Sequence, residues 1–394
     1  AGNGDHQGSG RVGGDGVMAK LGEVCKLNMG QSPDSSSYND TGDGIPFFQG
    51  NADFGEVHPN IRVWCNAPTK IAHPGEILIS VRAPIGAMNI ADCECCIGRG
   101  LASISVDESI CTTKYLWYDL FSKIEELNSK GTGSTFKAIN KKTLEETEVQ
   151  LRDMDEQRKI SETLDKITQL VSLRKQQLAK LDELVKARFV EMFGDPVYNE
   201  MHWETKRLID ICRTIVDCPH STPHYTTKDT GYKCIRTSAV KKNKILWEKV
   251  ECISKQEYEE RIKRKRPEKG DVIYTREGAI LGIAAVIDRD YNVALGQRSM
   301  LLSPDIYKCT PCFLSMAMNF DSFLGKALGG VSGSASPHIN VGDIKALEII
   351  APPIELQNQF AAFVERVDQQ KQTVQQSLEK LELMKKALMQ EYFG

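Results

Sequence analysis

Residues 155–194 read DEQRKISETLDKITQLVSLRKQQLAKLDELVKARFVEMFG, and residues 354–394 read IELQNQFAAFVERVDQQKQTVQQSLEKLELMKKALMQEYFG. In both stretches apolar residues recur at alternating spacings of three and four over about four heptads, which is typical of a coiled-coil helix. The predicted seam consists of Ile160, Leu164, Ile167, Leu178 and Leu181 in the first helix and Phe360, Val364, Val367, Leu378 and Leu381 in the second.

The two stretches are also copies of each other. At an offset of 200 residues, Gln157 matches Gln357, and the endings 193–194 and 393–394 are both Phe-Gly. The match continues upstream, where Gly75-Glu-Ile-Leu pairs with Gly270-Asp-Val-Ile at an offset of 195, and 44–48 pairs with 231–235 at 187. The pairs Gly133-Ser134 and Gly333-Ser334 keep the order. Offsets that rise in steps are expected from small insertions in the second copy, so the sequence predicts one unit written twice.

Each predicted unit is a globular domain followed by a helix, and the fold class is α+β. Short β-branched runs such as 76–81 and 271–275 predict strands. Residues 114–127 and 311–328 predict helices late in each domain. The predicted parts are a disordered arm or expression remnant (1–17), a first globular domain (18–152), a central helix (153–194), a second globular domain (200–351) and a C-terminal helix (353–394).

The helix ends carry start and stop signals. Asp153 with Glu156 predicts a capping box, and Gly194 followed by Pro196 predicts a helix end. A helix of this length spans about 58 Å. The second helix must run antiparallel to bury its seam on the first. The expected molecule is a pseudo-twofold repeat with two unlike heads on a two-helix coiled coil, which matches pseudo-palindromic DNA geometry.

Composition sets the broad class. The chain has 394 residues, 41% hydrophobic residues and a formal net charge of −3. No apolar run of about 18 residues occurs, so we expect no membrane contact. The 12 cysteines lack paired zinc spacing, and we expect reduced thiols packed as small apolar groups, with no metal site. Local positive charge gathers in 261–269, which is either a DNA-facing patch or a solvated surface.

Several phrases of the sequence resemble target-recognition domains of type I restriction–modification specificity subunits. In the first domain these are GQSPDSSSYNDTGDGIPFFQGNADFG (30–55), ISVRAPIGAMNIA (79–91) and IGRGLASI (97–104). In the second they are VDCPHSTPHY (216–225), IRTSAV (235–240) and GDVIYTREGAILG (270–282). The stretch KARFVEMFGDP (186–196) resembles the end of the family's central helix. The resemblance covers about residues 18–394.

The resemblance implies a role in the prokaryotic cytosol. Such a subunit binds double-stranded DNA at a bipartite site, docks two methyltransferase subunits and optionally two restriction subunits. The methyltransferase modifies adenine N6, and the adenine must be flipped out of the duplex. No cofactor is expected in this chain; S-adenosylmethionine, and ATP with Mg²⁺, would be bound by partner subunits.

Motifs for catalysis are missing. Asp195-Pro196-Val197-Tyr198 lacks the second proline of an adenine-methyltransferase motif, and Gly325-Lys326 is followed by alanine where a P-loop needs Ser or Thr. We therefore expect a non-catalytic subunit. Two alternatives stay open: a coiled-coil scaffold whose heads bind proteins, and the recognition part of a fused restriction–modification enzyme.

Base contacts are expected from polar loop residues, because Arg or Lys pairs with guanine and Asn or Gln with adenine. The candidates are Gln31, Ser32, Ser35, Tyr38, Gln49 and Asn51 in the first domain, and His220, Ser221, His224, Tyr225, Arg236, Thr237 and Ser238 in the second. Gln49 and Arg236 occupy equivalent repeat positions. Phosphate contacts or internal framing are expected from Arg82, Arg99, Arg276 and Arg298.

Overall fold

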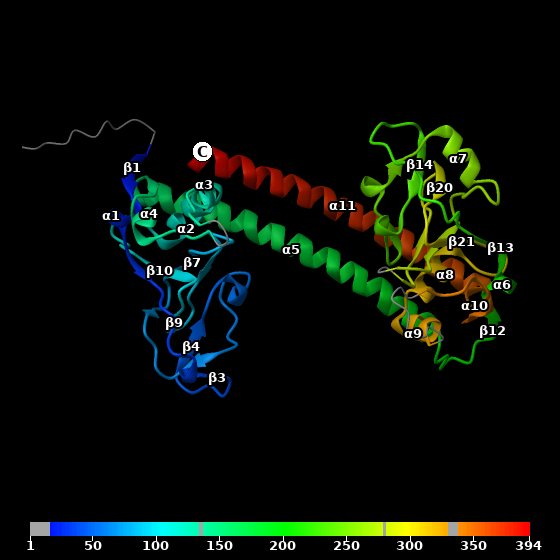
Figure 1. The fold of residues 1–394 in the computed structure, drawn as a ribbon, viewed down its shortest axis with the longest axis horizontal. Helices are drawn as coiled ribbons and strands as arrows, with labels where there is room; N and C mark the ends of the chain where they lie inside the picture. Colours follow the sequence, from blue (N-terminus) through cyan, green and yellow to red (C-terminus); the bar gives the residue numbers. More distant parts are fainter. Residues whose placement is uncertain (1–15, 134–136, 279–280, 330–337) are drawn as a thin grey trace, which may run out of the picture. The chain divides into compact units, whose positions relative to one another are not determined.

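The computed structural model describes residues 16–133, 137–278, 281–329 and 338–394 (Figure 1). The chain divides into two compact units. Unit 1 consists of residues 1–175 and 376–394, and unit 2 of residues 176–375. Two 40-residue helices, α5 (Met154–Phe193) and α11 (Ile354–Phe393), contribute to both units. The long helix predicted from the first heptad pattern is therefore confirmed by α5.

Unit 1 contains mixed short elements. Its strands are β1 (Val17–Lys20), β2 (Cys25–Met29), β3 (Tyr38–Asn39), β4 (Ile45–Phe48), β5 (Trp64–Cys65), β6 (Ile71–Ala72), β7 (Ile77–Ser80), β8 (Met88–Ile90), β9 (Cys95–Ile97), β10 (Leu101–Val106) and β11 (Glu148–Leu151). Its short helices are α1 (Leu21–Val24), α2 (Thr113–Ser122), α3 (Ile124–Ser129) and α4 (Lys141–Glu145), with 3-10 turns η1 (Ser35–Ser37) and η2 (Asn51–Asp53).

Unit 2 has a corresponding set of elements. Its strands are β12 (Thr205–Arg207), β13 (Cys212–Asp217), β14 (Tyr232–Ile235), β15 (Val240–Lys241), β16 (Lys244–Ile245), β17 (Glu251–Cys252), β18 (Val272–Thr275), β19 (Ala284–Val286), β20 (Asn292–Leu295), β21 (Ser299–Pro304) and β22 (Glu348–Ile350). Its helices are α6 (Leu208–Ile211), α7 (Lys255–Arg261), α8 (Pro311–Met318), α9 (Asp321–Leu328) and α10 (Val341–Ala346), with 3-10 turns η3 (Thr237–Ala239) and η4 (Trp247–Lys249).

The same sheet order occurs in each unit. Unit 1 has a four-stranded antiparallel sheet in the order β2-β10-β7-β8, and unit 2 has one in the order β13-β21-β18-β19. A parallel pair follows in both, β4 with β9 and β14 with β20. A two-stranded antiparallel pair, β1–β11 or β12–β22, joins the start of the domain to the strand before the long helix.

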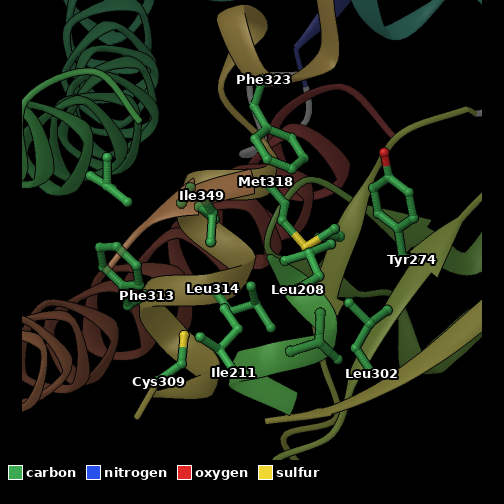
Figure 2. Packing of buried hydrophobic residues seen from close by; sticks show 14 of the residues in the cluster. Leu208, Ile211, Tyr274, Leu302, Cys309, Phe313, Leu314, Met318, Phe323 and Ile349 are labelled. Carbon is green, nitrogen blue, oxygen red and sulfur yellow. The ribbon is translucent and has the colours of Figure 1, made fainter. Parts of the chain in front are cut away.

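The four-stranded sheet lies between two apolar layers. In unit 1, Ile77 and Ile79 face a core with α2 and α5, whereas Leu78 faces a second core with Phe48 and Ile97. Successive side chains of a strand point to opposite faces of the sheet, so neighbouring residues belong to different cores. In unit 2, Tyr274 faces the helical core and Ile273 the second one. Figure 2 shows Leu314 and Met318 of α8 close to Leu208 of α6 in the helical core.

The ends of the long helices complete these cores. Phe393, at the end of α11, packs in unit 1 with its ring 5.2 Å from Tyr115. Phe193, at the end of α5, packs in unit 2 with its ring 5.0 Å from Phe313. Gly194 then ends α5 in the left-handed conformation with φ +73°, as its sequence position predicted. The core of each unit therefore includes an aromatic side chain from the C-terminal end of a long helix: α11 in unit 1 and α5 in unit 2.

A buried glutamine joins each domain to its following helix. Gln157 is fully buried; its Oε1 accepts from the Thr112 N–H at 2.8 Å, and its Nε2 donates to the carbonyls of Ile110 and Arg152. Gln357 is also fully buried, with Oε1 2.9 Å from the Thr310 nitrogen and Nε2 donating to Lys308 and Pro352. The matched glutamines of the sequence therefore make the same bonds.

Some local predictions need correction. Val17 was assigned to the disordered arm, but it begins β1 opposite Leu151; residues 1–15 lie outside the described part. Each predicted late helix is divided in two. In unit 2 the Asn319 side chain donates to the Ala284 carbonyl at 2.8 Å, and Phe320 is extended before α9 begins. In unit 1 the break falls at Lys123, with φ −99° and ψ 9°.

The predicted capping box is half formed. Asp153 Oδ1 accepts from the Glu156 N–H at 2.9 Å, but the Glu156 carboxylate pairs with Arg152 at 2.7 Å instead of returning to the cap backbone. Ser134, Gly333 and Ser334, used in the repeat alignment, lie outside the described residues.

Burial keeps most of the cysteine thiols protonated. All 12 are free, and burial raises the pKa of the Cys95 and Cys111 thiols to about 12.

In the described ranges no three His, Cys, Asp or Glu side chains gather as a metal site, and no helix has the length and apolar character needed to span a membrane.

The buried glutamine predicts a stability effect. We expect Gln157→Leu to leave the Thr112 N–H and two carbonyls without partners in the core, which lowers the free energy of unfolding by about 2–4 kcal/mol. Denaturant unfolding monitored by circular dichroism measures this. Gln176→Leu, at an exposed position of the same helix, is the control and should change stability by less than about 0.5 kcal/mol. Equal effects of the two changes would contradict the assigned role.

Candidate nucleic-acid interface

The parallel strand pair of each unit brings two loops to one sheet edge. In unit 1, Phe48 of β4 lies opposite Ile97 of β9, so the next residues, Gln49 and Gly98, are neighbours. The Gly98 N–H donates to the Phe48 carbonyl at 2.8 Å. Because both strands end at the same edge, polar side chains from distant segments gather there.

The corresponding edge of unit 2 has the same register. Ile235 of β14 lies opposite Leu295 of β20, and the Gly296 N–H donates to the Ile235 carbonyl at 2.9 Å. Arg236 therefore occupies the place that Gln49 has in unit 1. The sequence equivalence of these two residues is supported by strand register as well as by alignment.

The unit 1 edge joins four predicted residues. Ser32 Oγ lies 3.1 Å from Oε1 and 3.0 Å from Nε2 of Gln49, and it accepts from the Arg99 N–H at 3.2 Å. The Gln31 N–H donates to the Ile97 carbonyl at 3.0 Å. Gln31, Gln49 and Arg99 are exposed. The three loops thus present a polar surface of amide, hydroxyl and guanidinium groups.

Asp53 fixes the main chain of this edge. The carboxylate of Asp53 is buried, accepts from the Gln49 N–H at 2.8 Å, and pairs with the Arg62 guanidinium. Asn51 is half-buried in η2. A residue held through its backbone by a buried acid keeps one orientation, so Gln49 is pre-organised.

The other predicted residues of unit 1 lie nearby in sequence but differ in role. Tyr38 is half-buried, its ring stacks on Phe47 at 4.7 Å, and its hydroxyl donates to the Pro33 carbonyl at 2.9 Å. Ser35 is exposed at the start of η1. Arg82 is exposed just after β7. These contacts assign Tyr38 to the frame of the loop.

The loop 218–225 of unit 2 is anchored by two side chains. The Arg261 guanidinium is buried and donates to the carbonyls of Ser221 and Leu295, the latter at 3.0 Å. Gln297 Nε2 donates to the His220 carbonyl. Arg261 and Gln297 therefore tie this loop to the end of β20, while His220 and Ser221 are exposed.

Arg236 is held from two sides. One guanidinium N–H donates to Glu251 Oε2 at 2.9 Å, and the guanidinium carbon lies 4.7 Å from the centre of the Tyr225 ring. The hydrogen bond to Glu251 raises the pKa of Arg236, and burial raises the pKa of Tyr225. Thr237 is half-buried and Ser238 exposed in the turn that follows.

The ring of His224 is 97% exposed, but its backbone is fixed. Glu257 Oε1 accepts from the His224 N–H at 2.8 Å and lies 2.9 Å from Nδ1. The backbone hydrogen bond from His224 lowers the pKa of Glu257. Glu257 is therefore an anchor that presents the imidazole to solvent.

Arg276 was expected either to contact phosphate or to frame the domain from inside. Its side chain is 9% exposed and makes a bidentate pair with Asp217, with Nε 2.9 Å from Oδ1 and the second bond at 3.1 Å. The side chain is therefore nearly inaccessible to a phosphate, and two of its nitrogens already donate to Asp217. This geometry favours the alternative role, internal framing, which the sequence also left open.

Arg298, unlike Arg276, is accessible to solvent. Its side chain is 55% exposed, and its Nε is 4.0 Å from Glu277. The backbone of Arg298 has φ +67°, which is rare for a bulky residue and is held by the N–H of Arg276 donating to its carbonyl at 3.0 Å. Backbone strain of this kind often marks functional sites.

The basic run 261–269 is partly compensated, because two of its six basic residues pair with acids. Arg261 is buried in the frame, Lys263 pairs with Glu260 at 2.6 Å, and Lys265 pairs with Glu268 at 3.0 Å. The sequence counted these charges without their partners. Arg264, Arg266 and Lys269 are exposed, so both alternatives for this run stay predictions.

The predicted seam residues lie against neighbouring elements. Ile160, Leu164, Ile167, Phe360, Val367 and Leu378 are buried, and Leu178, Leu181, Val364 and Leu381 are half-buried. Within unit 1 Lys175 of α5 pairs with Glu382 of α11 at 3.0 Å, and within unit 2 Asp182 of α5 pairs with Lys371 of α11 at 2.6 Å. The two helices thus contact each other in both units.

Sequence reasoning missed the groups that orient the candidate residues. Asp53, Glu251 and Glu257 were not singled out, because acids are rarely chosen as candidates for DNA contact. Gln297 directly follows Gly296, the glycine after β20, and this position is a signal that could have identified it.

Comparison with known proteins identifies relatives over most of the chain. The family model for the type I restriction modification DNA specificity domain matches residues 15–183 and 200–383. A curated specificity subunit of Methanocaldococcus jannaschii, assigned to the type I restriction enzyme MjaX, is 40% identical over 161 residues, which is 41% of this chain and 38% of that protein. The MjaIX specificity subunit of the same organism is 24% identical over 318 residues, which is 75% of this chain and 71% of that one.

A solved structure resembles the whole fold. The S subunit of the type I restriction-modification system of M. genitalium has a TM-score of 0.61 and 14% identity, over 98% of both chains. At this identity the likeness concerns the fold alone.

The Arg276–Asp217 pair predicts a change in stability. We expect Arg276→Ala to leave the Asp217 carboxylate without its bidentate partner and to lower the free energy of unfolding by about 3 kcal/mol. Arg298→Ala, which removes a half-exposed arginine on the adjacent loop, serves as the control and should cost about 0.5 kcal/mol or less. A different result would support a phosphate contact by Arg276: the Arg276→Ala protein would be as stable as the wild type, and the slope of log binding constant against log salt concentration would be smaller by about one.

Proposed function

The chain belongs to the type I restriction modification DNA specificity domain family, and on this premise we propose that it is the sequence-recognition subunit of a type I restriction–modification enzyme. The observation that carries the proposal is one loop-bearing sheet edge occurring in both units with different side chains, Gln49 in one and Arg236 in the other. Two equivalent sites with unlike readers suit a bipartite DNA target with two unlike halves.

The chemistry of each edge suits direct readout in the major groove. Amide, guanidinium, hydroxyl and imidazole groups stand on loops that a sheet holds in place, and these groups pair with base edges. The exposed arginines Arg82, Arg99 and Arg298 supply phosphate contacts. The bases between the two half-sites would go unread.

In the proposed complex this chain performs recognition and its partners perform catalysis. Two methyltransferase subunits dock on the chain and methylate a flipped-out adenine at N6 in each half-site, and two restriction subunits can join. S-adenosylmethionine, and ATP with Mg²⁺, belong to those partners. The sequence motifs that would bind them are missing from this chain.

The two long helices form the proposed spacer. Between the α5 positions 175 and 182 the ion-pair partner on α11 moves from 382 to 371, which is the direction of antiparallel pairing. An antiparallel coiled coil relates two equivalent domains by a pseudo-twofold axis. The spacer length would then set how many base pairs separate the half-sites.

DNA binding separates this function from a protein-binding scaffold. We expect the chain, assembled with its cognate methyltransferase subunit, to bind DNA in a gel-shift assay with affinity that falls about 10³-fold or more between 50 and 200 mM salt, because several phosphate contacts release counterions. A scaffold would show no salt-sensitive shift. A recognition part cut from a fused enzyme would need no separate methyltransferase chain.

The spacer proposal predicts a change of target. Inserting four residues after Gln176 lengthens α5 by about 6 Å and turns its end by about 40°. One base pair advances DNA by about 3.4 Å and turns it by about 34–36°. We expect active variants to keep both half-sites and to read a spacer longer by one or two base pairs.

The matched control inserts the same four residues after Asp290, in the exposed loop between β19 and β20, which belongs to neither long helix. The control should keep the original spacer. An active Gln176 insertion that also keeps it would mean that something other than these helices sets the spacing.

A further inference from the structure

Resting on the proposed function, we propose that Arg236 reads a guanine in one half-site and Gln49 reads an adenine, other than the methylated one, in the other. Tyr225 and Glu251 are positioning residues for the guanidinium. Ser32 is the positioning residue for the amide. The observation behind this assignment is that these two equivalent side chains are each fixed by neighbours while staying exposed.

The strand register makes the two positions equivalent. Gln49 directly follows β4, and Arg236 directly follows β14. In both units the glycine that follows the paired strand donates its N–H to the last residue of β4 or β14: Gly98 to the Phe48 carbonyl, and Gly296 to the Ile235 carbonyl. Both glycines lie close to the neighbouring strand: a Cβ at position 98 would be 3.0 Å from the Gln49 Cα, and a Cβ at position 296 would be 2.9 Å from the Ile235 carbonyl oxygen. The frame brings each reader to the same place on its sheet.

Arg236 keeps donors for a base after satisfying its neighbours. A guanidinium carries five N–H groups in one plane, and Glu251 takes one nitrogen, at 2.9 Å. The Tyr225 ring, with the guanidinium 4.7 Å from its centre, fixes the orientation of that plane. The remaining N–H groups can form the bidentate pair with guanine O6 and N7.

The positioning residues stand on rigid elements. Glu251 begins β17, where it lies opposite Cys234 in the antiparallel pair with β14. Tyr225 packs against the cluster of Cys234, Ile253 and Tyr258. A reader held in this way loses little side-chain entropy on binding, which favours both affinity and discrimination.

The acid beside Arg236 argues against a phosphate contact. A carboxylate 2.9 Å from the guanidinium compensates its charge and repels an approaching phosphate. Base edges carry partial charges, so the same carboxylate costs a guanine contact much less. Gln49 is uncharged, and its amide offers the donor and acceptor that adenine N7 and N6 require.

The test measures base preference with the intact complex. The full chain is assembled with its methyltransferase subunits, and binding is measured on DNA libraries in which each base pair of the wild-type target is varied in turn. We expect Arg236→Ala to reduce preference for one G·C pair about 10-fold or more while the other half-site is unchanged. Gln49→Ala should act in the same way at one A·T pair of the other half-site.

The positioning role has its own variants. Glu251→Gln and Tyr225→Leu should weaken preference at the same G·C pair that Arg236→Ala affects, with unchanged thermal unfolding, whereas Tyr225→Phe should retain it because the ring remains. Arg236→Lys should fail to restore it, because an ammonium lacks the planar fork. Arg213→Ala, at an exposed position of β13, is the control and should leave every position unchanged.

Three results would overturn this inference without touching the proposed function. Arg236→Ala could leave the base preference unchanged at every position, or it could change the preference at an A·T pair. Gln49→Ala could change the preference only at a G·C pair. Full guanine preference in both Glu251→Gln and Tyr225→Leu would overturn the positioning role. A wild-type complex without any bipartite sequence preference would overturn the proposed function, and this inference with it.

Discussion

Both cores depend on side chains that the long helices bring to them. Phe393 packs against Tyr115 in unit 1, and Phe193 packs against Phe313 in unit 2. Full burial of an aromatic side chain contributes about 1.5–3 kcal/mol, and removal leaves a cavity whose cost adds to the loss. Since each helix serves both units, a helix that supported one domain alone would leave the other core incomplete. The repeated buried glutamines, Gln157 and Gln357, fix where each helix leaves its domain.

On this frame the two units differ mainly in what they present. Parallel strand pairs with the same register end in loops, and the loop residue is Gln49 in one unit and Arg236 in the other. The devices that hold these residues also differ. Unit 1 uses the buried Asp53 beneath the backbone, whereas unit 2 uses the Tyr225 ring and Glu251 beside the side chain. The two units therefore share one architecture and carry different side chains at the equivalent loop position.

Sequence reasoning succeeded where the signal was local and periodic. The heptad pattern placed α5, which begins at Met154 and ends at Phe193, and the family match supports two domains in mixed α and β structure. It failed where one distant partner decides the outcome. Arg276 is buried where it pairs with Asp217, which lies 59 residues away in the sequence. Glu257, which anchors the backbone of His224, is 33 residues away from it. The strand order and the break at Asn319 likewise depend on contacts that no single stretch contains. The base-reading residues themselves stay predictions.

The central claim is that two unlike recognition edges on one chain read one bipartite DNA target. Its most direct measurement is single-molecule methylome sequencing of a methylation-free host that expresses the chain with its cognate methyltransferase subunit. The account predicts one motif made of two short, unlike half-sites separated by a spacer of fixed length, with N6-methyladenine on both strands. A continuous motif, or N6-methyladenine at the same sites when the chain is omitted, would contradict it.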